Sequence, residues 1–422
     1  MIFFNISKCL ILGLLIKYNI YNDKLLKILL KNINKSGPIC IKMVQWGLPY
    51  MKLTNVNNNI INILENTYEK CTIHSMDYTK KIFKNDFYNS FDDDYEIINI
   101  IGSGSIAQVY KIKDKKNKKY YAMKVIHPKA TDNFNIIKYY LKLLFKFISF
   151  NKIIPVSLDD FLNQFEDQLN FINETNNLLI FNDLYKNNNL YKIPKLYKFS
   201  ENIIIMEYIH GKSLEEYKNK SIQYYKYHIM IYIFMNNNLF INNFNHSDLH
   251  NYNWKITDDD KIVIYDFGLC WELTNFDIID SIEHLGKGFH YMDNNLIYKA
   301  FHGFVRYSST IEEKIIKKYF DKINIKCYNE FTFHIIYFFK ENNINLNIKI
   351  LYKIISYQNV RLTFQKKFKG NNFDYTGIYK EELTICDYYN IFPAYQEHLN
   401  IQLKKYKNNN NIDYKKLYKF IK

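Results

Sequence analysis

The sequence predicts an α+β fold with two lobes, preceded by a helical extension and followed by a helical region. Three observations support this prediction. Short apolar segments that resemble strands flank a glycine-containing turn at 101–110. Apolar residues then recur at helical spacing between 158 and 179. Finally, a polar segment at 246–253 is followed by a short predicted hairpin and by Asp266-Phe267-Gly268.

At 422 residues the chain is long enough for one two-lobed domain with additions at both ends. We expect a helical N-terminal extension at 1–91, a small lobe with an inserted helix at 92–210, and the core of a large lobe at 211–310. Residues 311–422 are predicted to form a helical C-terminal region, in which the asparagine run at 408–411 is a low-complexity break.

The polar segment has the spacing of a kinase catalytic loop. Asn253 follows Asp248 by five residues, and Asp266 opens an Asp-Phe-Gly motif after the intervening hairpin. Phosphoryl transfer needs one carboxylate near the attacking group and oxygen ligands for Mg²⁺. We therefore assign catalysis to Asp248 and metal binding to Asn253 and Asp266. His246 and His250 are expected to form structural hydrogen bonds.

The glycine-containing turn is predicted to cover the phosphates of a nucleotide. Small residues let backbone N–H groups approach an anion closely. The residues assigned to this part of the site are Gly102, Ser103, Gly104, Ser105 and Val109. On the next strand Lys124 lies between apolar Met123 and Val125, so its side chain is expected to point inward, toward the phosphates.

Glu174 is the predicted ion-pair partner of Lys124, and both are assigned to catalysis. Apolar residues recur at helical spacing from Leu158 to Leu179, so we expect one long amphipathic helix to carry Glu174. Its side chain should then meet the Lys124 ammonium within about 4 Å, the reach of an ion pair.

The apolar segment at 203–211 is typical of a buried strand that ends in a hinge. In a kinase, backbone groups at this place bind the adenine ring. Glu207 and Ile209 are therefore assigned to nucleotide binding.

Two features distinguish the chain from ordinary protein kinases. Fifty residues separate Lys124 from Glu174, so an extra helix is expected at about 134–150. No Ala-Pro-Glu motif follows Asp266-Phe267-Gly268, which leaves little room for an activation segment.

These departures and the motifs themselves resemble the UbiB (AarF-domain) family of atypical kinases. Segments 105–109 and 123–128 match its Ser-Ile-Ala-Gln-Val and Val-Lys-Val-x-x-Pro motifs. Segment 168–177 is similar to its Glu-Leu-Asp-Phe-x-x-Glu-Ala-x-Asn helix, and 246–253 to its His-x-Asp-x-His-Pro-Gly-Asn loop. Its Lys-x-Gly-Gln motif is approximated at 42–45.

The resemblance covers roughly residues 35–280. It implies an ATPase or kinase that serves coenzyme Q or related isoprenoid-lipid pathways at a membrane, with mitochondria as the implied location. It also implies that a helix carrying Lys42 and Gln45 folds over the nucleotide cleft and regulates it. Because Gly37-Pro38 precedes this motif, the helix is expected to begin near Ile39.

The sequence departs from the family pattern at positions that affect this closure. Val44 replaces the motif glycine, and Gln168 and Asn170 replace two acidic residues that would attract Lys42. Lys42 is therefore expected to be held less firmly than in relatives. Two alternatives follow: a pseudokinase scaffold that binds a nucleotide or a partner without turnover, and a true protein serine/threonine kinase with an open cleft.

The net charge of +15 is compatible with a polyanionic partner, yet the composition favours another cause. Lys, Asn, Ile, Tyr and Phe dominate, as in AT-rich coding sequences, and Arg306 and Arg361 are the only arginines. Because arginine is favoured for phosphate recognition, no specific nucleic-acid partner is expected. The expected ligand is ATP or ADP with Mg²⁺, and the expected partners are isoprenoid lipids or lipid-biosynthetic proteins.

The six cysteines are scattered without Cys-x-x-Cys pairs. This pattern favours a reducing intracellular compartment over a disulfide framework or a zinc site. The apolar segment at 9–16 is too short to span a bilayer. It is expected either to pack as a helix against the lobes or to contact a membrane peripherally.

Overall fold

The computed structural model describes residues 2–352 except 18–19, 54–56, 68–72, 129, 146–154, 218–226 and several further positions between 228 and 327. Most of the predicted C-terminal region, 353–422, therefore lies outside the described residues. The chain divides into two compact units. The first unit comprises Met1–Asn182, Pro194–Ile209 and Asp266–Leu269; the second comprises Asp183–Ile193, His210–Tyr265 and Cys270–Lys422.

The first unit begins with four helices that share an apolar core. They are α1 (Ile2–Lys17), α2 (Asp23–Lys35), α3 (Pro38–Leu53) and α4 (Asn58–Leu64), followed by the 3-10 turn η1 (Glu65–Thr67). Asn22 caps α2 by accepting a hydrogen bond from the Leu25 N–H at 3.0 Å. Gly37 has φ +91°, which glycine adopts without strain, and Pro38 then starts α3 close to the predicted position.

The apolar segment at 9–16 belongs to α1, and part of it contributes to this helical core. Leu12 is buried there, and Cys9, Leu15 and Ile16 pack against the same cluster. Within the described part of the chain, no helix has the length and apolar character needed to cross a bilayer. Packing against α2–α4 therefore accounts for part of the apolar character of α1.

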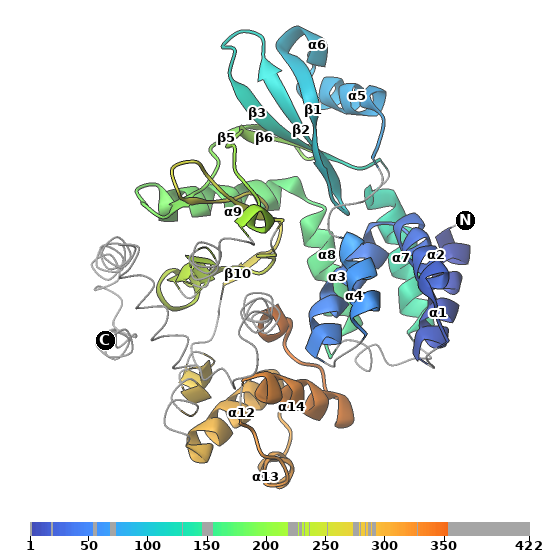
Figure 1. Ribbon diagram of the computed structural model, residues 1–422, viewed down its shortest axis with the longest axis vertical. Helices are drawn as coiled ribbons and strands as arrows, with labels where there is room; N and C mark the ends of the chain where they lie inside the picture. Colours follow the sequence, from blue (N-terminus) through green and yellow to red (C-terminus); the bar gives the residue numbers. More distant parts are fainter. Residues whose placement is uncertain are drawn as a thin grey trace. The chain divides into compact units, whose positions relative to one another are not determined.

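The first unit also contains a five-stranded antiparallel sheet. Its order is β1 (Tyr95–Ser103), β2 (Ala107–Asp114), β3 (Tyr120–Ile126), β6 (Ile203–Glu207) and β5 (Leu196–Phe199). Helices α5 (Met76–Phe87) and α6 (Phe91–Asp94) lie beside β1 (Figure 1). Phe83 and Phe91 pack into the sheet core with Met123 and Val125. The aromatic core fixes which face of β3 is apolar.

Three helices lie between strands β3 and β5 in the sequence. They are α7 (Ala130–Leu144), α8 (Leu158–Gln168) and α9 (Phe171–Tyr185). The predicted extra helix is present as α7, although 146–150 of its predicted range lies outside the described residues. The predicted single helix from Leu158 to Leu179 is wrong, because the chain breaks between α8 and α9. The Asn170 side chain accepts a hydrogen bond from the Ile172 N–H at 3.0 Å and so starts a new helix.

The second unit contains two small sheets and a helical region. Strand β9 (Ile262–Ile264) pairs with β8 (Trp254–Ile256) and β4 (Tyr191–Lys192), and β7 (Phe244–His246) pairs with β10 (Cys270–Glu272). The predicted hairpin at 254–265 is present, with Asp260 at φ 63° in its turn. The remaining elements named here are η3 (Leu214–Tyr217), the π-helix η4 (Asn238–Asn242), α12 (Asn294–Ser308), α13 (Glu313–Phe320) and α14 (Tyr328–Glu341). The mixture of helices with small sheets confirms the predicted α+β class.

Candidate active site

The position of Lys124 follows from the alternation of side chains along β3. This strand lies between β2 and β6, so both of its edges are hydrogen-bonded. Met123 and Val125 are fully buried in the aromatic core on one face. Lys124 must therefore extend from the opposite face, as predicted. Val109 on β2 pairs directly with Lys124, which places it on that same face.

Glu174 reaches Lys124 from the first turn of α9. The Lys124 Nζ lies 2.7 Å from Oε1 and 2.8 Å from Oε2 of Glu174, and both residues are buried. The predicted ion pair across fifty residues is confirmed. Glu166, which a different helix register would have placed at Lys124, instead pairs with Lys138. The chain therefore starts a new helix after Asn170, and Glu174 on this helix still contacts Lys124 as predicted.

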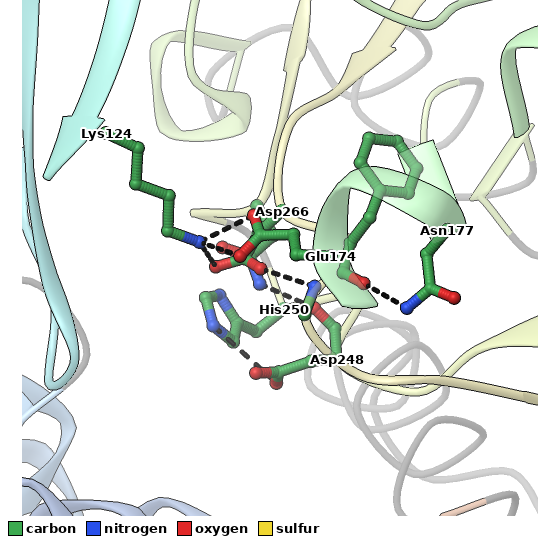
Figure 2. Close-up of polar contacts among 9 residues, drawn as sticks. Lys124, Glu174, Asn177, Asp248, His250 and Asp266 are labelled. Carbon is green, nitrogen blue, oxygen red and sulfur yellow. Dashed lines mark hydrogen bonds and ion pairs between the residues drawn. The ribbon is translucent and has the colours of Figure 1, made fainter. Parts of the chain in front are cut away.

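Asp266 supplies a second carboxylate to the same ammonium. The Lys124 Nζ lies 3.3 Å from Asp266 Oδ2, and Figure 2 shows the amine directed at both carboxylates. Asp266 Oδ1 accepts a hydrogen bond from the Gly268 N–H at 3.0 Å. The Asp266 side chain is 41% exposed, compared with 4% for Glu174, so it is the accessible carboxylate of the pair.

Two residues without a predicted role affect the Asp-Phe-Gly segment, Asn177 by a hydrogen bond and Gly268 by its lack of a side chain. Asn177, one turn beyond Glu174 on α9, donates its amide to the Phe267 carbonyl at 2.8 Å. A Cβ on Gly268 would lie 3.2 Å from Asp266 Oδ1 and 3.5 Å from Glu174 Oε2. Asn177 belongs to the motif at 168–177 and Gly268 to the Asp-Phe-Gly motif. Their place in these motifs was the only sequence feature that pointed to a role.

The pKa values reflect the balance between burial and charge in this cluster. Burial lowers the pKa of Lys124, but Asp266 and Glu174 together outweigh it, so the pKa is raised above its ordinary value. Burial raises the pKa of Glu174 to about 7, and the Lys124 ammonium opposes this increase. With both oxygens of Glu174 within hydrogen-bond distance of the amine, we assign Lys124 as a permanent ammonium between two carboxyl groups.

The glycine-containing turn joins β1 to β2. Gly104 donates its N–H to the Ala107 carbonyl at 2.9 Å, which closes the turn, while Ser103 and Ser105 are buried. A Cβ at Gly102 would meet no atom within 4 Å, and one at Gly104 would come no closer than 3.8 Å to Ala107 O. The neighbouring protein atoms therefore leave room above these glycines.

The predicted hinge lies at the end of β6. Glu207 pairs with Tyr121 on β3, and its backbone N–H donates to the Lys195 carbonyl at 2.8 Å. Ile209 follows outside the strand. Their contact with an adenine stays a prediction.

Lys42 and Gln45 lie on α3, as predicted, and both are buried. Gln45 donates its side-chain amide to the Thr67 carbonyl at 2.8 Å, which ties α3 to η1. Lys42 is 7% exposed, so its side chain does not extend into solvent. A regulatory role of this pair toward the nucleotide stays a prediction.

The catalytic-loop residues belong to the second unit. Asn253 donates its side-chain amide to the Asp248 carbonyl at 2.8 Å, and His250 Nε2 lies 3.7 Å from Asp248 Oδ1 (Figure 2). The Asp248 N–H donates to His246 Nδ1 at 3.2 Å. His250 Nδ1 accepts a hydrogen bond from the Tyr252 N–H at 3.3 Å, so both histidines make the structural hydrogen bonds expected of them.

The donor set suits Mg²⁺ rather than a metal held by the protein alone. Among the described residues, no group of three or more His, Cys, Asp and Glu side chains could hold a metal ion. Magnesium bound with a nucleotide takes most of its ligands from phosphates and water and one or two from the protein. The exposed carboxylate of Asp266, in the first unit, fits that requirement. The amide oxygen of Asn253, in the second unit, stays the other predicted ligand.

Comparison with known proteins identifies the family. The family model "ABC1 atypical kinase-like domain" matches residues 67–300, which is more than half of the chain. The chain belongs to the ABC1 atypical kinase-like family. This confirms the resemblance inferred from the motifs, and the matched range includes Lys124, Glu174, Asp248 and Asp266.

Two further comparisons complete this result. No curated protein matches the chain. A solved structure of Rv3197 from Mycobacterium tuberculosis in complex with erythromycin is similar at 13% sequence identity and a TM-score of 0.47. The aligned region covers 68% of this chain and 80% of the Rv3197 chain. The family assignment rests on the family model alone.

Proposed function

We propose that this ABC1-family chain binds ATP or ADP as its magnesium complex and transfers or hydrolyses the terminal phosphoryl group. The observation that supports the proposal is the Lys124 ammonium held between the carboxyl groups of Glu174 and Asp266. Two carboxyl groups around a single ammonium leave negative charge on the exposed Asp266. A magnesium nucleotide complements this arrangement, because its metal meets the carboxylate and its phosphates meet the ammonium.

Each residue has a distinct task in the proposed reaction. Lys124 orients the α- and β-phosphates, and Glu174 holds the amine in place. Asp266 and Asn253 would each offer an oxygen ligand to Mg²⁺, and the ion would supply positive charge to offset the charge that develops on the transferred group. Asp248 accepts a proton from the attacking hydroxyl group or water molecule.

For the acceptor we propose an isoprenoid lipid or a protein of isoprenoid-quinone biosynthesis, at a membrane within a reducing compartment. Family membership supports this choice. The thiols of Cys9 and Cys40 form no disulfide, which suits a reducing compartment. Burial raises the pKa of Cys40 to about 12, which keeps that thiol protonated and unreactive.

The decisive experiment is thermal unfolding of wild type and Asp266→Asn with MgADP, and with ADP in excess chelator. We expect wild type to be stabilised by about 2.7 kcal/mol at a ligand concentration 100-fold above Kd. The variant should lose the part that depends on Mg²⁺. Asp259→Asn is the matched control, because Asp259 is an exposed carboxylate paired with Lys192 at 2.9 Å. An equal Mg²⁺-dependent shift in wild type and Asp266→Asn would contradict the proposal.

A measurement of ATP turnover distinguishes an enzyme from a pseudokinase scaffold that only binds the nucleotide. Purified protein would be incubated with labelled ATP, with and without liposomes that contain an isoprenoid lipid, and with protein acceptors. Release or transfer of phosphate, abolished by Asp248→Asn, is the expected result. Mg²⁺-dependent binding without any turnover would instead establish a pseudokinase, and transfer to a general protein acceptor would establish a protein kinase.

A further inference from the structure

The tip of the glycine-containing turn is anchored by one residue beyond the end of β3. His127 donates its backbone N–H to the Ile106 carbonyl at 2.9 Å. Its side-chain Nε2 lies 3.1 Å from the Gly104 carbonyl oxygen. Since Gly104 also closes the turn onto Ala107, three hydrogen bonds define this tip, and two of them come from His127.

His127 is in turn held by a second histidine, from the segment before α5. His74 Nδ1 lies 2.8 Å from His127 Nδ1, and His74 Nε2 lies 3.0 Å from the Thr79 hydroxyl. The Thr79 hydroxyl lies 2.6 Å from the Tyr110 hydroxyl, which accepts from Gln108 Nε2 at 2.6 Å. Gln108 Oε1 accepts the His74 backbone N–H at 2.8 Å, which closes a ring of hydrogen bonds.

With both imidazoles neutral, only one assignment of donors and acceptors satisfies all of these hydrogen bonds. The Gly104 carbonyl is only an acceptor, so His127 Nε2 must carry hydrogen and His127 Nδ1 must accept. His74 Nδ1 then donates, and His74 Nε2 accepts from Thr79. Burial lowers the pKa of His74 to about 4 and also lowers the pKa of His127, so both are neutral near neutral pH.

The direction of these bonds has a consequence for the turn. The C=O of one residue and the N–H of the next point in opposite directions across a trans peptide. Holding the Gly104 carbonyl toward His127 therefore directs the Ser105 N–H to the other side of the turn. Within the described part of the chain, this N–H donates to no protein acceptor. An N–H without a protein acceptor keeps the capacity to donate to an anion.

We propose that His127, supported by His74, is a positioning residue that aims the Ser105 N–H at the phosphates of the bound nucleotide. This inference rests on the proposed function, because it requires a nucleotide beneath the turn. A metal ion bound by both imidazoles would be another explanation for the short distance between His74 Nδ1 and His127 Nδ1, but the ligands do not favour it. Structural zinc takes four nitrogen or sulfur ligands, and no third His, Cys, Asp or Glu joins this pair among the residues described.

The test compares His127→Leu, which removes the donor, with His127→Gln, whose amide nitrogen can replace Nε2. We expect His127→Leu to raise the Kd for MgADP and the KM for MgATP about tenfold, the effect of losing one hydrogen bond of about 1.4 kcal/mol. The kcat should change less than about threefold, because the catalytic carboxylates stay in place. His127→Gln should recover most of the affinity.

His334→Leu is the matched control. His334 is also half-buried and also has a lowered pKa, and its Nδ1 lies 3.1 Å from the Tyr319 hydroxyl. It lies in the second unit, away in sequence from the glycine-containing turn. This variant should lose comparable stability and leave nucleotide affinity unchanged, so it separates a loss of fold from a loss of positioning.

Two readouts without nucleotide make the outcome specific. Imidazole ¹⁵N shifts should show the Nδ1–H tautomer for His74 and the Nε2–H tautomer for His127. Amide hydrogen exchange at 103–107 should be faster in His127→Leu than in wild type. The opposite tautomers, unchanged exchange or unchanged affinity in a protein that binds MgADP would overturn the positioning role. A wild-type protein that binds no MgADP would refute the proposed function itself and the positioning role with it.

Discussion

Two polar clusters in the first unit begin within three residues of each other and are built on opposite principles. Lys124, in β3, enters a cluster of charges with Glu174 and Asp266. His127, just beyond the strand, enters a ring of neutral groups that includes His74. The charged cluster keeps an exposed carboxylate, whereas the hydrogen bonds of the neutral cluster are all made within the protein. The first is therefore suited to exchange partners with a ligand, and the second to hold a shape.

Removing the ammonium should produce the largest effect and would test the charged cluster directly. In Lys124→Met, Glu174 and Asp266 lose their shared cation, and the phosphates lose theirs. We expect turnover to fall about 10²–10³-fold and the free energy of unfolding to fall by up to about 3 kcal/mol. Phosphate release and thermal unfolding measure the two effects.

Lys138→Met provides the control for that variant. Lys138 pairs with Glu166 at 2.5 Å, but its side chain is 24% exposed and that of Glu166 is 50% exposed. Such a pair contributes less than about 1 kcal/mol. Equal losses of stability in both variants would show that the charged cluster is an ordinary surface contact.

The start of α9 determines whether Glu174 reaches this cluster. Asn170→Ala removes the side-chain oxygen that caps the helix, and should lower the free energy of unfolding by about 0.5–2 kcal/mol. Asn170→Asp retains the cap and places a negative charge at the helix N-terminus, where it is favourable. Chemical denaturation should therefore rank Asp at least equal to Asn and both above Ala. A ranking with Ala equal to Asn would mean that the cap does not stabilise the break.

The neutral cluster should reveal itself by its dependence on pH. The pKa of His74 is lowered from 6.5 to about 4 on folding. The unfolded state therefore binds more protons in this interval, and the contribution of His74 to stability is lost as the pH falls through it. The difference in Tm between wild type and His74→Gln should be largest above pH 6.5 and should shrink toward pH 4. A constant difference across this range would show that the imidazole is not held neutral.

The smallest effect is expected at Lys42. Gln168 and Asn170 are uncharged, where the family pattern has an acidic residue at each position, so we expect these two positions to attract Lys42 less strongly than in relatives. We expect Lys42→Ala to change nucleotide turnover by less than about fivefold, the low end of coupling between sites. Restoring charge with Gln168→Glu and Asn170→Asp together should make the effect of Lys42→Ala larger. A large effect of Lys42→Ala in the otherwise native chain would refute this expectation.

The sequence predicted the charged cluster better than the helices around it. Lys124 and Glu174 belong to motifs that follow one another in a fixed order along the chain. An inserted segment between two motifs does not change this order, so both residues could be recognised. The break at Asn170 was missed because Phe165, Leu169 and Ile172 continue the helical period across it. An asparagine that caps a new helix leaves this apolar pattern unchanged, so periodicity alone does not reveal it.

The neutral cluster was not predicted at all, and its composition explains why. His74 and His127 are fifty-three residues apart. Neither lies in a periodic pattern, and the bonds between them depend on how α5 packs against the sheet. Only the fold brings such side chains together, because no spacing rule connects them.

Gly268 makes the charged cluster sensitive to a change that alters no charge. Among the described glycines only Gly37 has a positive φ, so alanine at 268 could adopt the native backbone. Its methyl group would nevertheless stand 3.2 Å from Asp266 Oδ1 and 3.5 Å from Glu174 Oε2. The residue type at 268 is thus set by the space that two crowded carboxylates leave. In Gly268→Ala the methyl group would push the carboxyl groups of Asp266 and Glu174 apart by a fraction of an ångström. The variant would change the geometry around Lys124 while it keeps every ionisable group of the cluster.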